Sequence, residues 1–259
     1  MSIAPADVLE RGGWLRCSEP FPHIVARNVF TPSFYDALER QIRTVLGRGL
    51  SETPAPGRFS RNLPGYDAYG IGLGQPAGEP TSLFLSPGWR DLLAGVWDIG
   101  RTPYVFVGAH HHTPGSLSGF VHNDFNPVWF PRSMNGGIQI PRQDLCSYKT
   151  GEGTLAEDER IEVVRGAALI FFCANDSWCP GDGGETGLYT SGDARVGDYV
   201  AGWAPENNTL ISFECTPQSF HGFIGNVRIP RTSIIMWVHR PLEEAAALYG
   251  EERLERWKS

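Results

Sequence analysis

Two stretches decide how this chain is interpreted: Phe120-Val121-His122-Asn123-Asp124-Phe125 and, much later, Ser219-Phe220-His221-Gly222-Phe223. Side chains in a strand alternate between two sides, so we expect His122 and Asp124 to face one point while the residue between them turns away. His221 would complete a set of two imidazoles and one carboxylate. That set leaves coordination positions open, and it suits non-haem Fe(II) that must bind further ligands.

The surroundings of these residues make the pattern more specific than a His-x-Asp triplet alone. A strand-like run comes before His221, and Arg231 opens an apolar strand after it. Between the two ligand stretches lie Asp182-Gly183-Gly184-Glu185 and Pro205-Glu206-Asn207-Asn208. Taken in this order, the motifs over about residues 100–240 resemble the Fe(II)/2-oxoglutarate-dependent oxygenases, in particular their prolyl-4-hydroxylase-like branch.

The resemblance implies the cofactors and two more site residues. Members of the family use Fe(II), 2-oxoglutarate and O₂, with ascorbate as a supporting reductant, and a basic residue binds the remote carboxylate of 2-oxoglutarate. Arg231 matches that residue and offers a planar bidentate fork, Ser233 lies on the same strand face, and Arg228 is the competing anchor. Asp124 stands where related halogenases have a small residue. The resemblance therefore implies hydroxylation, with desaturation, cyclisation and epoxidation left open.

Many short strand-like runs separated by turns, with helical patterns toward both ends, predict the fold class. The strand pattern favours a mainly β sandwich or barrel with flanking helices (α+β). The resemblance implies that it is a distorted double-stranded β-helix of the jelly-roll or cupin-like kind. The iron is expected between its two sheets at one end. We expect a single domain, 1–259, with N-terminal helices and a lid loop in 1–100, the β-helix core in 101–240 and a C-terminal helix in 241–259.

Local signals add detail to this plan. Thr31-Pro32 and Ser86-Pro87 predict the starts of two helices. The Gly- and Pro-rich residues 48–80 and the residues 126–159, which are polar from 142 onward, predict long loops beside the site. The run His110-His111-His112 continues a predicted strand, in which its first and last members face opposite to the middle one. We interpret it as part of a pocket or of the core rather than as a second metal site.

Composition excludes several other classes of protein. The net charge is −7 without a basic run, which argues against nucleic acid as a partner. No run of about 18 apolar residues occurs, so no membrane span is expected. The 5 cysteines are odd in number and include no Cys-x-x-Cys motif, which is typical of reduced cysteines in a cytoplasmic protein.

The substrate is less well indicated than the chemistry. Trp129 and Arg132 follow the His-x-Asp motif, and Arg58 lies in the predicted lid loop, so we expect these three to contact substrate. A small molecule, free or carrier-bound, is the favoured substrate, such as an amino acid or a natural-product intermediate, because the long loops favour an enclosed pocket. A peptidyl or protein prolyl hydroxylase, a non-catalytic jelly-roll binding module and a redox-silent cupin-like metal enzyme are the alternatives. The chain is expected to be a monomer or homodimer.

Overall fold

The computed structural model describes residues 3–61, 66–74, 78–133 and 136–256. Parts of the predicted loops 48–80 and 126–159, and the end of the predicted C-terminal helix, lie outside the described residues. The elements are α1 (Pro5–Val8), β1 (Trp14–Cys17), β2 (His23–Arg27), α2 (Pro32–Leu46), β3 (Tyr69–Gly72), the 3₁₀ turn η1 (Thr81–Leu85), α3 (Pro87–Val96), β4 (Val105–His112), β5 (Pro127–Pro131), η2 (Glu157–Glu159), β6 (Arg160–Phe172), β7 (Thr186–Leu188), β8 (Ala201–Trp203), β9 (Thr209–Glu214), β10 (His221–Phe223), β11 (Arg231–Pro241), α4 (Leu242–Tyr249) and η3 (Glu251–Arg253).

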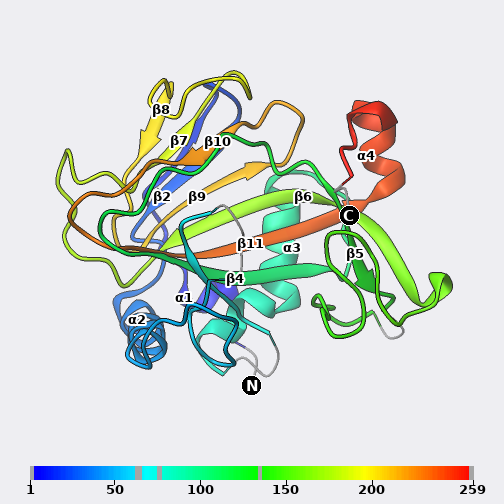
Figure 1. Cartoon of the computed structure of the whole chain (residues 1–259), viewed down its shortest axis with the longest axis horizontal. Helices are drawn as coiled ribbons and strands as arrows, with labels where there is room; N and C mark the ends of the chain where they lie inside the picture. Colours follow the sequence, from blue (N-terminus) through cyan, green and yellow to red (C-terminus); the bar gives the residue numbers. More distant parts are fainter. Residues whose placement is uncertain (1–2, 62–65, 75–77, 134–135, 257–259) are drawn as a thin grey trace.

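The strands form two antiparallel sheets (Figure 1). The larger one, the major sheet, runs in the order β1-β2-β9-β6-β11-β4-β3, and β5 pairs with the first part of β6. The minor sheet runs in the order β10-β7-β8. This is the two-sheet arrangement expected for a double-stranded β-helix, with β6 and β11 as the long central strands of the major sheet.

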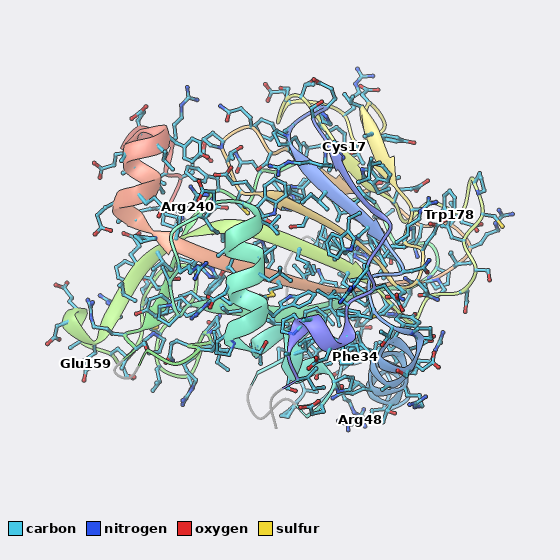
Figure 2. The ribbon with its side chains drawn as sticks, turned by 180° about the vertical axis from the view of Figure 1, so that it is seen from behind. Cys17, Phe34, Arg48, Glu159, Trp178 and Arg240 are labelled. Atoms are coloured by element: carbon cyan, nitrogen blue, oxygen red, sulfur yellow. The ribbon has the colours of Figure 1, made fainter. Side chains whose placement is uncertain are left out.

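The two faces of the major sheet have different partners. Because strand side chains alternate, one face turns toward the minor sheet and the other toward the helices. Phe171 of β6 belongs to the outer face, where it packs in one apolar cluster with Phe34 of α2 and Trp89 of α3. Figure 2 shows α3 crossing the back of the sheet, with Phe34 close by. An apolar cavity of about 240 Å³ also lies on this outer side, between α3 and the β1–β2 pair.

Both predicted helix starts are observed, with different capping. At α3 the Ser86 Oγ accepts a hydrogen bond from the Trp89 backbone N–H at 3.2 Å, as an N-cap residue does. At α2 the Thr31 side chain makes no capping bond, and Pro32 at the first helical position is the remaining signal. Burial of Phe34, Leu38 and Ile42 along one stripe then stabilises the helix against the sheet.

Several elements differ from the sequence-based expectation, and one of them is β5, which forms inside the predicted loop 126–159 and pairs with β6. The pattern predicts separate strands at 160–164 and 167–172, whereas β6 runs unbroken through Arg165 because that side chain is buried beside a carboxylate. Within the predicted lid loop, Tyr69–Gly72 forms the edge strand β3, and the first hundred residues also supply β1 and β2 to the major sheet. The C-terminal helix is shorter than 241–259: α4 ends at Tyr249, because Gly250 takes a φ of 89° that a helix does not permit.

Candidate metal centre and co-substrate pocket

His122, Asp124 and His221 meet between the two sheets. Their ligand atoms all lie within 4.8 Å of one another. His122 and His221 face each other across a backbone bridge, in which each N–H donates to the other residue's carbonyl, at 3.0 and 2.7 Å. Asp124 then places Oδ1 3.7 Å from His122 Nε2 and Oδ2 3.5 Å from His221 Nε2. The two residue stretches chosen from the sequence are therefore brought together.

Each histidine is oriented for metal binding by a hydrogen bond on its far side. His122 Nδ1 lies 3.0 Å from the Phe120 carbonyl oxygen, and His221 Nδ1 lies 3.0 Å from the Ser219 carbonyl oxygen. A carbonyl oxygen only accepts, so both Nδ1 atoms carry the proton and both Nε2 atoms keep a free lone pair. This is the tautomer that a metal-binding imidazole needs. Burial and the neighbouring His221 also lower the pKa of His122 to about 4, so its ring is neutral at pH 7.

Asp124 reaches the site by a different route from the expected strand. Its φ is 59°, in the left-handed region, so the backbone turns sharply here instead of continuing as a strand. The turn carries the chain from the edge of the minor sheet at His122 to β5 in the major sheet. Asn123 is turned away, as expected, and its side-chain amide donates to the Pro217 carbonyl at 3.2 Å. The expectation that the two ligands share one side is met through this turn rather than through strand alternation.

Two residues of the major sheet hold the Asp124 carboxylate. Arg165 Nη1 donates to Oδ1 at 2.5 Å, and the Trp237 indole N–H donates to Oδ2 at 2.8 Å. Burial alone would raise the pKa of Asp124, but the Arg165 guanidinium and the nearby histidines hold it well below its ordinary value. The carboxylate is therefore ionised at neutral pH, as a metal ligand must be.

Arg231 begins β11 in a buried position without an acidic partner among the described residues. Its guanidinium lies between the rings of Phe172 and Phe223, at 5.2 and 5.0 Å from their centroids. Its Nη2 donates to Thr186 Oγ1 at 3.1 Å, while its Nε has no hydrogen-bond partner. Burial lowers the pKa of Arg231 to about 10. A buried cation without a counter-charge is unfavourable, so this position is suited to an anionic ligand.

More polar atoms without partners gather on the same inner face. Ser233 is fully buried and its Oγ has no partner, and the same holds for His110 Nδ1 and His112 Nε2. Register pairs Ser233 with His110 and Arg231 with His112, so these four side chains share one face. Tyr66 lies over them, with its ring 6.0 and 5.5 Å from the rings of His110 and His112. The pocket can accept an anion with further hydrogen-bonding oxygens, which fits 2-oxoglutarate.

The other predicted site residues lie elsewhere or serve other partners. Trp129 is half-buried in β5, where Arg160 stacks on its ring at 5.1 Å. Arg132 donates to the carbonyl oxygens of Asp158 and Arg160 at 2.9 and 3.2 Å, and Arg58 is exposed. Their contact with substrate stays a prediction. Arg228, the competing anchor, is exposed and donates to Asp182 at 2.7 Å. Unlike Arg231, it is therefore not a buried cation without an acidic partner.

Residues 143–239 match the family model described as the 2OG-Fe(II) oxygenase superfamily. The matched segment includes the third triad ligand, His221, and the buried Arg231. This segment of the chain is similar to the 2OG-Fe(II) oxygenases. A search among curated proteins gave no significant match.

Solved structures of prolyl hydroxylases share the fold. A prolyl-4-hydroxylase from Pseudomonas putida aligns with a TM-score of 0.52 and 17% identity, over 89% of this chain and 94% of that one. A Trichoplax adhaerens prolyl hydroxylase, in complex with a hypoxia-inducible-factor peptide, aligns with a TM-score of 0.52 and 15% identity, over 87% and 86%. A prolyl 4-hydroxylase from Phytophthora capsici gives 0.52 and 14%, over 92% and 63%. At such identities the likeness concerns the fold, and it confirms the double-stranded β-helix.

Family match, fold and triad together bear out the prediction of a 2-oxoglutarate-dependent dioxygenase with Fe(II), 2-oxoglutarate and O₂ as its cofactors. The resemblance to the prolyl-4-hydroxylase-like branch is confirmed in the fold. The role of ascorbate stays a prediction. Within the described ranges, no helix is long and apolar enough to cross a membrane.

Sequence reasoning missed several residues of the site. Trp237 lies on the same face of β11 as Arg231 and Ser233, so two-residue periodicity from Arg231 would have found it. Arg165 is the one charge inside an apolar run from Val163 to Phe172, which is a signal for a buried partner. Its partner is 41 positions away in sequence, and no local pattern identifies it.

Proposed function

We propose that this dioxygenase hydroxylates, or otherwise oxidises, an unactivated C–H bond of a small molecule such as an amino acid or a natural-product intermediate, and converts 2-oxoglutarate to succinate and CO₂. The observation that carries the proposal is the combination of two sites on one inner surface. One is a triad with free Nε2 atoms and an ionised carboxylate. The other is a buried arginine that lacks a counter-charge.

The residues divide the work between binding and orientation. His122, Asp124 and His221 would hold Fe(II), which supplies the O₂-dependent oxidation when bound together with 2-oxoglutarate. Arg231 would bind the remote carboxylate of 2-oxoglutarate through a planar fork, with Ser233 Oγ as a second donor. Arg231 and Ser233 both lie on β11, so the co-substrate would be held in one orientation.

Two long loops support an enclosed substrate pocket. Tyr66 comes from the loop 48–80 and lies against His110 and His112. Tyr148 comes from the loop 126–159, and its ring lies 5.3 Å from that of Phe106, which in turn lies 5.1 Å from that of Trp237. Aromatic side chains brought over a site by loops favour a compact, partly apolar substrate.

A peptidyl or protein prolyl hydroxylase is the second candidate, and a surface feature favours it. Leu117 and Phe120 are 74% and 60% exposed, and Phe120 lies beside His122, with ring centroids 5.1 Å apart. Exposed apolar side chains next to a reactive centre suit an extended peptide. Prolyl hydroxylases are also among the similar solved structures, one of them in complex with a peptide.

The first experiment is an anaerobic titration of the metal-free chain with Fe(II) and 2-oxoglutarate, followed by the visible absorption of the metal–2-oxoglutarate chelate. We expect a band that is lost in His122→Ala. Succinate release is then measured with proline-containing peptides and with a panel of small amino acids and ring-bearing acids, and products are analysed by mass spectrometry. Turnover on the small molecules alone supports the first candidate, and turnover on the peptides alone supports the second. A chain that binds neither ligand would instead be a binding module.

A further inference from the structure

Arg165 is a second buried arginine, and metal binding by the triad does not in itself require it. It lies within β6, its side chain is 8% exposed, and its Nη1 contacts Asp124 Oδ1. The triad ligands come from other segments, and the proposed co-substrate anchor is Arg231. Any effect of Arg165 on the metal centre is therefore exerted through the Asp124 carboxylate.

Asp124 differs from the two histidines in how it is held. The backbone bridge between His122 and His221, and the two Nδ1 hydrogen bonds, fix both imidazoles within the minor-sheet side of the site. Asp124 follows a left-handed turn, and its carboxylate oxygens are held by Arg165 and Trp237 of the major sheet. The orientation of this ligand thus depends on donors from outside its own segment.

Arg165 is itself fixed in place. Its Nε donates to the Tyr148 hydroxyl at 3.3 Å, and its guanidinium stacks on the Trp237 ring at 4.1 Å. The Tyr148 hydroxyl in turn lies 2.9 Å from His239 Nε2. A planar guanidinium can meet Asp124 and Tyr148 at once in this geometry, which a lysine ammonium cannot reproduce.

We propose that Arg165 is a positioning residue which, together with Trp237, sets the orientation of the Asp124 carboxylate and thereby tightens metal binding by the triad. The proposal rests on the proposed metal site. The positive charge of Arg165 alone would oppose a divalent cation. Partners of metal ligands nevertheless tighten binding by about 10- to 100-fold in general, because a ligand already oriented loses less freedom on binding. We infer that orientation outweighs repulsion here.

The test is an anaerobic titration of the metal-free full chain with Co(II), which reports affinity by calorimetry and ligand geometry by its visible spectrum. Arg165→Met is expected to bind Co(II) about 10- to 100-fold more weakly, with altered visible bands. Arg165→Lys should recover part of the affinity. Tyr148→Phe removes the hydroxyl that orients Arg165 without touching Asp124, and a smaller loss in the same direction is expected.

Arg256→Met is the matched control. Arg256 lies at the surface and pairs at 2.8 Å with Glu162, which belongs to β6 as Arg165 does. Its Co(II) affinity and spectrum should equal those of the parent chain. If Arg165→Met binds as tightly as the parent or more tightly, the proposal is overturned. Should that variant fail to fold, unchanged binding in both Arg165→Lys and Tyr148→Phe overturns it equally. A parent chain that binds no Co(II) overturns the metal site itself, and with it this proposal.

Discussion

Two buried arginines on the same inner surface of the major sheet have opposite electrostatic surroundings. Arg165 meets the Asp124 carboxylate and the Tyr148 hydroxyl, and these contacts raise its pKa against the effect of burial. Arg231 has two aromatic rings and a threonine hydroxyl around it, and burial lowers its pKa to about 10. A buried charge with its partner already in place serves the protein's own structure. A buried charge without one indicates where a ligand of opposite sign binds.

The largest expected effect concerns the triad, which both arginines flank. His221→Ala removes one of the three ligands and leaves the backbone groups of the bridge to His122 in place. We expect substrate-dependent succinate release to fall to background. Co(II) affinity should fall by more than about 100-fold, because a residue that binds the metal contributes more to affinity than a residue that only hydrogen-bonds to such a ligand. Arg228→Met serves as control, since Arg228 is exposed and pairs with Asp182. Retained turnover in His221→Ala would rule out this ligand set.

The next effect distinguishes Arg231, which should affect 2-oxoglutarate binding, from Arg165, which should affect metal binding. Arg231→Met should weaken 2-oxoglutarate binding by about 2–5 kcal/mol, the usual range for removing one partner of a buried charge pair. Co(II) affinity should stay within about twofold of the parent value, because Arg231 contacts Thr186, Phe172 and Phe223 rather than the triad ligands. Calorimetry measures Co(II) binding on the metal-free chain and 2-oxoglutarate binding on the Co(II)-loaded chain. Equal weakening of both ligands would mean that Arg231 supports the fold rather than the co-substrate.

A third effect compares the arginines by stability in the ligand-free chain. Arg165→Met leaves the Asp124 carboxylate buried without its cation and should lower the free energy of unfolding by about 3–5 kcal/mol. Arg231→Met removes a buried cation that has no counter-charge, so we expect no loss of stability or a gain. Urea denaturation of both variants gives the comparison directly. Similar losses in the two variants would contradict the contrast between a paired and an unpaired charge.

The smallest effect extends the comparison to pH. Burial lowers the pKa of His111 to about 4, and this residue faces away from the triad, with its Nδ1 2.9 Å from Thr232 Oγ1. Between about pH 6.5 and pH 4 the unfolded chain binds a proton at His111 that the folded chain does not, so stability falls as the pH falls. This histidine contributes a slope of about 1 kcal/mol per pH unit in that window. His111→Gln should show a shallower loss in acid denaturation curves.

The sequence predicted the fold and the site to different extents. Helix starts at Ser86-Pro87 and Thr31-Pro32, and the strand opened by Arg231, follow from local patterns, and the structure contains all of them. The two-sheet fold was predicted through the order of the motifs and their resemblance to a family. The continuous course of β6 was not, because Arg165-Gly166 separates two apolar runs and the partner of Arg165 is distant in sequence.

The site was predicted where its chemistry lies in short motifs. His122, Asp124, His221 and Arg231 each stand in such a motif, and the structure brings the three ligands together. The donors to Asp124 belong to other strands, so only the three-dimensional arrangement identifies them. The left-handed turn at Asp124 was also beyond local reasoning, because aspartate adopts this conformation more often than most residues but only in a minority of cases.

The division of the triad between the sheets has a consequence for motion. The histidines are held on the minor-sheet side, whereas the carboxylate is held by β6 and β11. An ion bound by all three therefore adds a link between the two layers, beside packing and the Arg231–Thr186 hydrogen bond. Binding should then slow the opening of β10 more than that of the helices on the far side of the major sheet. Amide hydrogen exchange along His221–Phe223 would then be slower in the metal-bound protein than in the metal-free protein. The exchange rate of this one short strand would report whether the metal centre is occupied, without any turnover.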